Sequence, residues 1–238
     1  MTGTVYLVGA GPGDPGLLTL KGKTLLELAD VVVYDALVSP PILALINPQA
    51  EQIFVGKYRG WHSLPQAKIT ELLIAKAQEY PTVVRLKAGD PFIFGRGGEE
   101  VQGLRQAGVP VEVVPGISAG LAMGFPLTHR QVSSSVTLVT GHEAVEKTQE
   151  SVNWSALAQG ADTLVIYMGM HRLAQITAAL RAGGRRAETP VCVVQWGTWP
   201  QERRVYGTLA TINDLVTQAG VTAPAIIVVG EVVTPEPL

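Results

Sequence analysis

The sequence is poor in charge, in cysteine and in long hydrophobic runs. Lysine and arginine total 18 and aspartate and glutamate total 20 among 238 residues, so that 16% of residues are charged and the net charge is −2. This balance argues against a protein that binds nucleic acid by neutralising phosphates, because such proteins usually carry a basic face. A charged fraction below the usual value of about 25% indicates that part of the apolar surface is covered by a second copy of the chain.

No hydrophobic run approaches the length of about 20 residues that crosses a membrane, and the N-terminal residues lack the pattern of a signal peptide. The single cysteine, Cys192, lies in an apolar run and has no partner for an intramolecular disulfide, so we interpret it as a buried thiol. The four histidines are scattered without metal-ligand spacing, so no metal site is expected. These features are typical of a cytoplasmic enzyme.

Apolar, β-branched runs alternate with helical segments, which is typical of βα units around a parallel sheet. The first half contains five predicted strands, Val5–Val8, Val31–Tyr34, Gln52–Val55, Thr82–Leu86 and Val111–Val114. The second half contains five more, Val136–Thr140, Thr163–Tyr167, Val191–Gln195, Arg203–Tyr206 and Ala225–Val229. Continuous apolar runs indicate strands buried on both faces. We therefore predict an α/β fold with two lobes, residues 1–115 and 116–238, each built on a mostly parallel sheet.

Two helix starts are predicted from capping residues. Thr19 precedes a leucine-rich helical segment and is a suitable N-cap. Ser63 and Gln66 have the spacing of a capping box ahead of a helix that runs to about Glu79.

Two glycine-rich loops follow predicted strands of the first lobe. One contains Gly9, Gly11 and Gly13, and the other runs from Lys87 to Glu100. Ligands of open α/β sheets bind at the carboxyl ends of strands, and glycine allows the backbone to approach a ligand closely. The loops therefore predict a small-molecule site built largely from backbone.

The residues between the glycines bear on the kind of ligand. The first loop departs from the dinucleotide fingerprint at Asp14, where a third glycine is needed, and Pro12 supplies no N–H donor. Asp14 and Asp90 add negative charge, which favours a neutral or cationic ligand over a phosphate. Asp35 and Lys57 follow the second and third strands and so belong to the same sheet edge. A nicotinamide-dependent oxidoreductase is the alternative of another class, and a purely structural turn is a further one.

Longer motifs resemble those of the tetrapyrrole methyltransferase family over essentially the whole chain. They comprise Val8–Pro15, Asp30–Asp35, Val84–Glu100, Val114–Ile117, Pro126–Arg130, Val139–His142, Tyr167–Gly169 and Pro224–Glu231. The run Gly-Asp-Pro-Phe with Phe-Gly-Arg-Gly-Gly-Glu-Glu is the most specific of them, whereas the first glycine loop is shared by many relatives.

The resemblance implies two α/β lobes with S-adenosylmethionine (SAM) in a cleft between them. It implies a homodimer that converts uroporphyrinogen III to precorrin-2 by two successive methylations, for sirohaem or cobalamin synthesis, with S-adenosylhomocysteine as the second product. The main alternative is a sibling enzyme of the same fold that methylates a later corrin intermediate. Ribosomal RNA and a modified histidine are substrates of other siblings, and a non-catalytic cofactor-binding protein is a further alternative.

Site residues follow from the same resemblance, position by position. It implies Asp35 as proton acceptor and Lys57 as proton donor. Implied SAM contacts are Pro12, Ala88, Gly89, Asp90, Ile93, Ser118, Ala119, Met168, Gly197 and Ala225. A substrate with eight carboxylates needs charge-assisted donors, for which we expect Lys57, Arg59, Lys87, Arg96 and Arg130.

The sequence departs from the family pattern at a few of these positions. Ala88 stands where a glycine is usual, Tyr58 stands where an arginine is usual, and Gln195–Thr198 replaces the common Glu-Asn-Gly-Thr. These departures bear on the substrate contacts more than on the cofactor.

Overall fold

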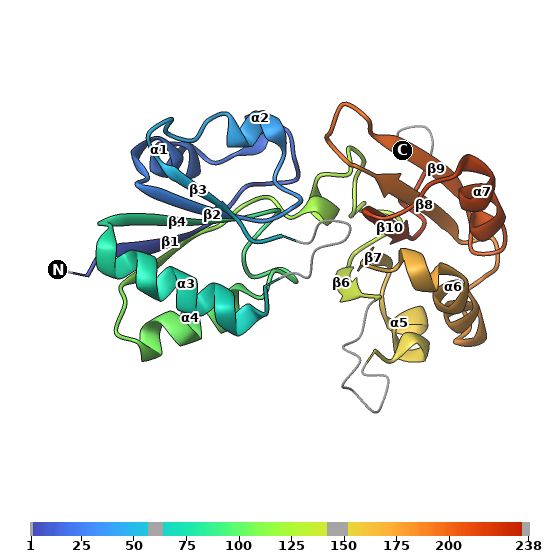
Figure 1. The fold of residues 1–238 in the computed structure, drawn as a ribbon. Coiled ribbons are helices and arrows are strands. Elements are labelled where there is room, and N and C mark those ends of the chain that lie inside the picture. Colours follow the sequence, from blue (N-terminus) through green and yellow to red (C-terminus); the bar gives the residue numbers. More distant parts are fainter. Residues whose placement is uncertain (1, 57–63, 142–151, 235–238) are drawn as a thin grey trace. The chain divides into compact units, whose positions relative to one another are not determined.

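The computed structural model describes residues 2–56, 64–141 and 152–234, and the chain divides into two compact units, Met1–Ser118 and Ala119–Leu238. Each unit contains one five-stranded sheet with helices packed against it (Figure 1). The predicted α/β fold is confirmed. Among the described residues, no helix is both long enough and apolar enough to cross a membrane.

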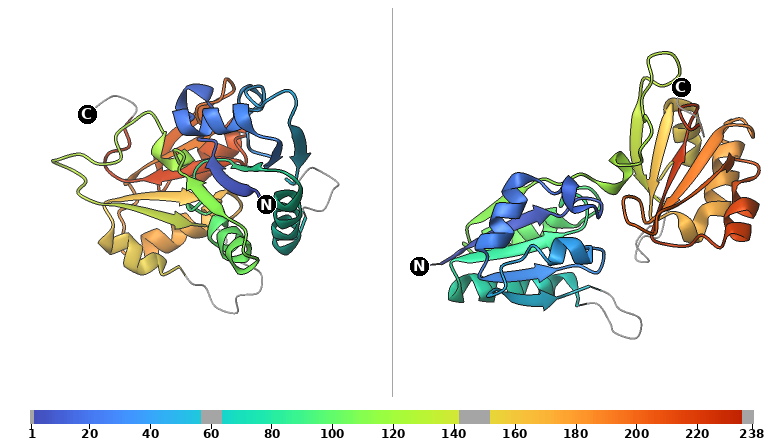
Figure 2. Two further views of the ribbon diagram at one scale, coloured as in Figure 1. Left: turned by 90° about the vertical axis from the view of Figure 1, so that its left-hand side faces the viewer. Right: turned by 90° about the horizontal axis from the view of Figure 1, so that it is seen from above.

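The first unit is built on a sheet in which every neighbouring pair is parallel, with strand order β3-β2-β4-β1-β5. Its strands are β1 (Thr4–Gly9), β2 (Val31–Tyr34), β3 (Glu51–Phe54), β4 (Thr82–Lys87) and β5 (Val111–Val114). The carboxyl ends of the three inner strands are level, because Gly9 pairs with Lys87 and Tyr34 pairs with Leu86. The N-terminal end of the chain lies at the opposite end of this sheet (Figures 1 and 2).

Alternating side chains give this sheet two hydrophobic cores. Val31 and Val33 belong to one core, and Val32 between them belongs to the other. Figure 1 shows helices over both faces. These are α1 (Leu20–Leu28) and α2 (Pro40–Leu43) on one face, and α3 (Gln66–Glu79) and α4 (Gly97–Gln106) on the other. Because both faces are covered, the inner strands are apolar at nearly every position.

The two predicted helix starts have different outcomes. The Thr19 cap of α1 is confirmed, since its side chain accepts a hydrogen bond from the Gly22 N–H at 3.1 Å. The capping box is wrong, because Pro65 occupies the N-cap position of α3 and Ser63 lies outside the described residues. The Gln66 side chain instead donates a hydrogen bond to Glu100 Oε1 at 2.8 Å.

The second unit contains a sheet with strand order β6-β7-β10-β8-β9, in which only the β6–β7 pair is parallel. Its strands are β6 (Val136–Thr140), β7 (Thr163–Tyr167), β8 (Pro190–Gln195), β9 (Arg203–Thr208) and β10 (Ala225–Val229). Here the structure differs from the mostly parallel sheet that the sequence predicted. An apolar run such as Ala225–Val229 indicates burial on both faces of the sheet. A central antiparallel strand can be buried in this way just as a parallel strand is, so the run does not determine strand direction.

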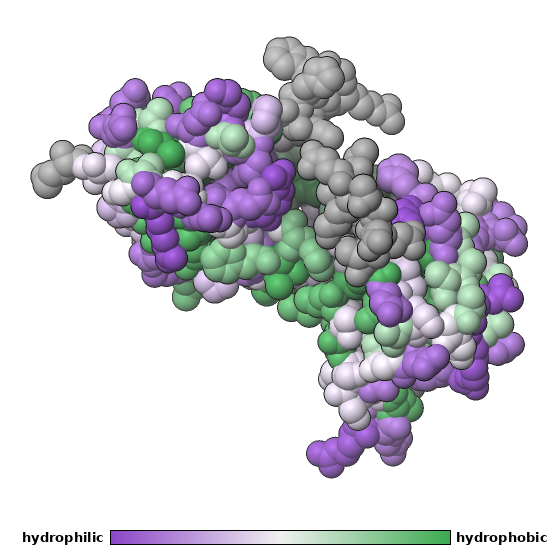
Figure 3. Space-filling view, turned by 90° about the horizontal axis from the view of Figure 1, so that it is seen from below, coloured by the Kyte–Doolittle hydropathy of each residue, from purple (hydrophilic) through white to green (hydrophobic). Residues whose placement is uncertain are grey.

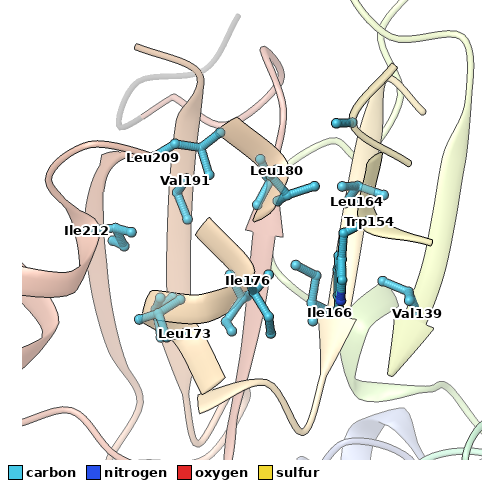
Figure 4. Packing of buried hydrophobic residues seen from close by; sticks show 14 of the residues in the cluster. Val139, Trp154, Leu164, Ile166, Leu173, Ile176, Leu180, Val191, Leu209 and Ile212 are labelled. Atoms are coloured by element: carbon cyan, nitrogen blue, oxygen red, sulfur yellow. The ribbon is translucent and has the colours of Figure 1, made fainter. Parts of the chain in front are cut away.

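Helices cover one face of this second sheet (Figure 4). They are α5 (Trp154–Gly160), α6 (Leu173–Ala182) and α7 (Ile212–Ala219). Leu164, Ile176 and Val191 are fully or nearly fully buried between sheet and helices. The short 3₁₀ helix η2 (Ala119–Leu121) packs on β7 and β10, where the Gly120 N–H donates a hydrogen bond to the Tyr167 hydroxyl at 3.0 Å.

Candidate functional site

The two glycine loops of the first unit are joined to one another by backbone hydrogen bonds. The Gly11 N–H donates to the Gly89 carbonyl at 3.1 Å, and the Gly89 N–H donates to the Gly11 carbonyl at 2.8 Å. The Ala10 N–H donates to the Lys87 carbonyl at 2.7 Å. The loops after β1 and β4 therefore form one rigid surface at the carboxyl edge of the sheet, where the sequence placed a ligand site.

Close backbone packing explains two glycines at this edge. A Cβ added to Gly9 would lie 2.5 Å from the Gly116 nitrogen, and a Cβ added to Gly116 would lie 2.3 Å from the Gly89 carbonyl oxygen. No side chain fits at such distances from backbone atoms. Gly89 instead needs its backbone conformation, since its φ of +69° is in the left-handed region.

Asp90 holds the second loop in shape. Its Oδ1 accepts a hydrogen bond from the Phe92 N–H at 2.8 Å, and its Oδ2 accepts one from the Gly116 N–H at 3.1 Å. Asp14 has a local role in the first loop, where it accepts a hydrogen bond from the Gly16 N–H at 2.7 Å. Asp14 and Asp90, whose negative charge argued against a phosphate ligand, thus also stabilise the conformation of their loops.

Backbone strain gathers in loops at the ends of strands. Among the described residues, the non-glycine residues with positive φ are Phe94, Arg96, Met168, Trp196 and Thr198. They lie in the loops that follow β4, β7 and β8. Strained conformations of this kind persist where the surrounding structure enforces them, and they cluster at functional sites.

Four charged side chains form a network beside the two glycine loops of the first unit. Arg85 and Lys87 of β4 meet Glu100 of α4 and Asp35 after β2. The Arg85 guanidinium lies 2.5 Å from Asp35 Oδ1 and 3.1 Å from Glu100 Oε1. The Lys87 ammonium lies 3.1 Å from Glu100 Oε1 and 3.8 Å from Asp35 Oδ2.

Burial dominates the electrostatics of this network. The exposed fractions of Arg85, Lys87 and Glu100 are only 1%, 3% and 0%. Loss of hydration lowers the pKa of Lys87 below its ordinary value, and the nearby positive charge of Arg85 lowers that pKa further. The carboxylates of Glu100 and Asp35 act in the opposite direction and raise the pKa of Lys87.

No role was predicted for Arg85 or Glu100 from the sequence. Both lie in the motif Val84–Glu100, and a sequence signal was present in it. Arg85 lies between the apolar residues Val84 and Leu86 of a buried strand, and a charge in such a strand requires a counter-ion. Glu100 supplies one from the first turn of α4.

The side chains expected to donate hydrogen bonds to the substrate differ in their exposure to solvent. Arg96 is exposed and forms a two-point ion pair with Glu99, with Nε–Oε1 and Nη2–Oε2 distances of 2.9 and 2.7 Å. This hydrogen bonding lowers the pKa of Glu99. Arg130 is exposed in a turn of the second unit. Lys87 is buried, and Lys57 and Arg59 lie outside the described residues.

Three of the expected SAM contacts meet at one edge of the second sheet. Met168 follows the end of β7, Gly197 follows the end of β8, and Ala225 begins the antiparallel strand β10 between them. Ala225 pairs with Gln195, and the Trp196 N–H donates a hydrogen bond to the Pro224 carbonyl at 3.3 Å. Ala119 begins η2, which packs on β7 and β10.

The remaining expected SAM contacts belong to the first unit. They are Pro12, Ala88, Gly89, Asp90, Ile93 and Ser118. Apart from Asp90, none of the residues expected to contact SAM is charged. Backbone and small side chains with one carboxylate suit a ligand that is neutral or positively charged. In the described part of the chain, no group of histidine, cysteine and acidic side chains is placed to hold a metal ion.

The sequence and fold place this chain in a family of methyl-transferring enzymes. It belongs to the tetrapyrrole (corrin/porphyrin) methylases, whose family model matches residues 4–213. The resemblance seen in the motifs is thereby confirmed.

Individual relatives are similar over most of this chain. A uroporphyrinogen-III C-methyltransferase of Synechocystis is 56% identical over 237 residues, which cover 98% of this chain and 90% of that protein. A crystal structure of uroporphyrin-III C-methyl transferase from Thermus thermophilus, complexed with S-adenyl homocysteine, has a TM-score of 0.84 at 44% identity and covers 97% of this chain and 98% of its own. A siroheme synthase of Nitrosomonas europaea is 50% identical over 236 residues, but this chain spans 49% of its length.

Proposed function

We propose that this chain is a SAM-dependent C-methyltransferase that converts uroporphyrinogen III to precorrin-2 by two successive methylations. The observation that carries the proposal is the 56% identity, over nearly the whole of both chains, to a uroporphyrinogen-III C-methyltransferase. Precorrin-2 is an intermediate toward sirohaem and cobalamin, and the proposal covers both routes.

SAM is the proposed methyl donor, and the relative from Thermus thermophilus that holds S-adenyl homocysteine supports this assignment. The proposed contacts are those named from the sequence in the two glycine loops of the first unit and at the Met168–Gly197–Ala225 edge of the second. Their chemistry supports the proposal, because a positively charged sulfonium has no basic side chain to oppose it among these residues and has the carboxylate of Asp90.

When bound, SAM supplies a methyl group on a cationic sulfur that leaves as a neutral thioether. An electron-rich pyrrole carbon of the porphyrinogen forms the new carbon–carbon bond as the carbon–sulfur bond breaks. The electron pair of the carbon–sulfur bond stays on sulfur. The protein contributes alignment of the reacting atoms, which is catalysis by proximity. The methylated macrocycle then loses a proton to restore its charge balance.

Asp35 is the proposed acceptor of that proton. It follows β2 at the carboxyl edge of the first sheet, and its side chain is 28% exposed while three charged neighbours are buried. Lys57 is the proposed proton donor, on the resemblance alone. General acid–base groups of this kind typically contribute about 10²–10⁴-fold in rate.

The substrate carboxylates are proposed to bind exposed cationic side chains. Arg96 and Arg130 have the required exposure, and Arg59 is proposed from the resemblance. Lys87 is also proposed as a substrate donor, although it is buried. Its ammonium is within hydrogen-bond distance of Glu100, so a direct substrate contact requires that this pair opens.

We also infer a homodimer located in the cytoplasm. The low charged fraction of 16% supports the dimer, together with large apolar side chains at the surface, such as Leu20 and Leu28 with exposed fractions of 85% and 64%. Figure 3 shows hydrophobic residues at the surface on the face it displays. The free, buried thiol of Cys192 supports a reducing compartment.

Anaerobic incubation of the purified protein with SAM and uroporphyrinogen III tests the proposed function. Mass spectrometry should show a product with two added methyl groups and a mono-methylated intermediate. Parallel reactions with a later corrin intermediate and with RNA provide the comparison. Methylation of either one, with uroporphyrinogen III untouched, would replace this proposal by that sibling activity.

A further inference from the structure

Arg85 connects two carboxylates that are far apart in the sequence. Its Nη2 donates to Asp35 Oδ1 at 2.5 Å, and its Nε donates to Glu100 Oε1 at 3.1 Å. Its Nη1 lies 3.4 Å from the backbone carbonyls of Val33 and Leu86. With contacts on every guanidinium nitrogen and 1% exposure, the Arg85 side chain is confined to one position.

Glu100 holds the opposite end of this arrangement. Its Oε1 accepts hydrogen bonds from Gln66 Nε2 at 2.8 Å, from Arg85 Nε at 3.1 Å and from Lys87 Nζ at 3.1 Å. Its Oε2 is buried and has no hydrogen-bond partner among the described residues. Oε1 thus accepts all three hydrogen bonds, two of them from the cations of β4, so Glu100 fixes both cations of the strand.

Asp35 is the member of the network that reaches solvent. Arg85 and Lys87 carry two positive charges, and Asp35 and Glu100 carry two negative charges, so the network is balanced. Arg85 donates a hydrogen bond to Asp35 Oδ1, whereas Lys87 Nζ lies 3.8 Å from Oδ2, beyond hydrogen-bond distance. Within residues 2–56, 64–141 and 152–234, Oδ1 of Asp35 is therefore held by a hydrogen bond, and Oδ2 has an ion pair with Lys87 but no hydrogen bond.

We propose that Arg85, anchored by Glu100, is a positioning residue that holds Asp35 by Oδ1 and leaves Oδ2 as the atom that receives the proton. This inference rests on the proposed role of Asp35 in the reaction. Arg85 touches neither substrate nor cofactor in this proposal and acts through the carboxylate. In the described residues, Arg85 and Lys87 of β4 form ion pairs with Asp35, and Glu100 of α4 pairs with both of these cations.

Removal of the two residues should have opposite effects on the pH dependence of the reaction. Loss of a cation beside a carboxylate raises its pKa, and loss of a neighbouring anion lowers it. Arg85→Met should therefore move the acidic limb of the kcat/KM profile to higher pH, and Glu100→Gln should move it to lower pH. A merely structural network predicts no such difference in sign.

The experiment compares Arg85→Met, Arg85→Lys and Glu100→Gln with the wild type. Measured quantities are kcat, KM for uroporphyrinogen III, affinity for S-adenosylhomocysteine and the pH profile. We expect kcat to fall about 10- to 100-fold in Arg85→Met with little change in cofactor affinity, and we expect partial recovery in Arg85→Lys. The matched control is Leu104→Ala, which opens a cavity in α4 of the same core and leaves the four charges in place.

The outcomes separate the two proposals. Wild-type turnover in a folded Asp35→Ala variant would overturn the proposed role of Asp35 itself. A loss in Asp35→Ala, together with wild-type turnover and an unmoved pH limb in both Arg85 variants, would overturn the positioning role alone. Glu100→Gln and Arg85→Lys keep the side-chain volume nearly constant. If Arg85→Met does not fold, these two variants test the positioning role in its place. Equal losses in the charge variants and Leu104→Ala, without a pH shift, would also contradict the proposal.

Discussion

Asp90 and Gly116 tie two backbone segments together at the edge of the first sheet. Asp90 Oδ2 accepts a hydrogen bond from the Gly116 N–H at 3.1 Å, while Oδ1 of the same carboxylate accepts one from the Phe92 N–H. Gly116 is also in close contact with Gly9 and Gly89. The Asp90 carboxylate therefore holds the backbone of the proposed SAM site in place and also supplies negative charge to it.

Replacing Asp90 with alanine should weaken binding of S-adenosylhomocysteine. The variant loses two hydrogen bonds to an ionised acceptor, which typically contribute about 1.5–3 kcal/mol each, and leaves the loop less well ordered. We expect a fall in affinity of about tenfold or more by calorimetry. Asp14→Ala is the matched control, because its turn is local to Gly16 and should affect affinity less. Wild-type affinity in Asp90→Ala would remove this residue from the site.

Two glycines of the first unit should respond oppositely to alanine. A Cβ at Gly9 meets backbone atoms at 2.5–2.7 Å, whereas a Cβ at Gly98 in α4 meets nothing within 4 Å. Gly9→Ala should lower the free energy of unfolding by at least ~2 kcal/mol, as overpacking against backbone does. Gly98→Ala should raise that free energy by up to about 1 kcal/mol, because alanine is the better helix former. Urea unfolding of both variants measures the difference, and equal stabilities would refute the packing argument.

Strand positions were predictable from the sequence because each strand is an apolar run between turn signals. All ten predicted strands are present, and their bounds differ by at most two residues from those observed. Strand direction in the second unit was not predictable, since β8 and β10 are buried on both faces in an antiparallel sheet. Burial determines the apolar pattern, and the neighbouring strand determines the direction.

The candidate site was predictable where strand order alone brings residues to one edge. Asp35 and the two glycine loops follow strands β2, β1 and β4, whose carboxyl ends are level. The partners of Asp35 were not predictable in the same way. Glu100 is 15 residues from Arg85 in sequence, and their contact depends on how α4 packs over β4.

The thiol of Cys192 should be unreactive in the folded protein at pH 8. Cys192 is fully buried in β8, and burial raises its pKa to about 12, so the thiolate fraction at pH 8 is on the order of 10⁻⁴. Dithionitrobenzoate should label it only after urea is added. Since the unfolded chain ionises nearer pH 9, it binds fewer protons than the folded chain between about pH 9 and 12, and stability should fall as pH rises through that window. Rapid labelling without urea would contradict the burial.

Loss of the Asp35 carboxylate should affect turnover and spare cofactor binding. Asp35→Ala and Asp35→Asn should each lower kcat by about 10²–10⁴-fold, the usual contribution of a general base. Affinity for S-adenosylhomocysteine should change little, because Asp35 is not among the proposed cofactor contacts. Initial rates and calorimetry on the same preparations provide both values. A parallel loss of cofactor affinity would show that Asp35 supports the binding site and not the proton transfer.

Arg96 should be needed for the substrate and not for the cofactor. Its side chain is 58% exposed, and its pairing with Glu99 presents a guanidinium beside the loop after β4. A charge-assisted bond lost to a substrate carboxylate costs about 1.5–3 kcal/mol and appears mainly in KM when it is equally strong in the ground and transition states. We expect Arg96→Ala to raise KM for uroporphyrinogen III by about 10- to 150-fold, with affinity for S-adenosylhomocysteine nearly unchanged.

A second Arg96 variant separates charge from backbone strain. Arg96 has a φ of +56°, in the left-handed region that favours glycine, so arginine and alanine both carry a conformational cost there that glycine avoids. Arg96→Gly should therefore show the same rise in KM with less loss of stability. Arg186→Ala, which removes an exposed ion pair with Glu231 in the second unit, is the control for loss of a surface arginine and should leave KM unchanged. If Arg96→Gly restored the wild-type KM, the effect of Arg96→Ala would belong to the loop conformation, and the substrate carboxylates would have to bind elsewhere.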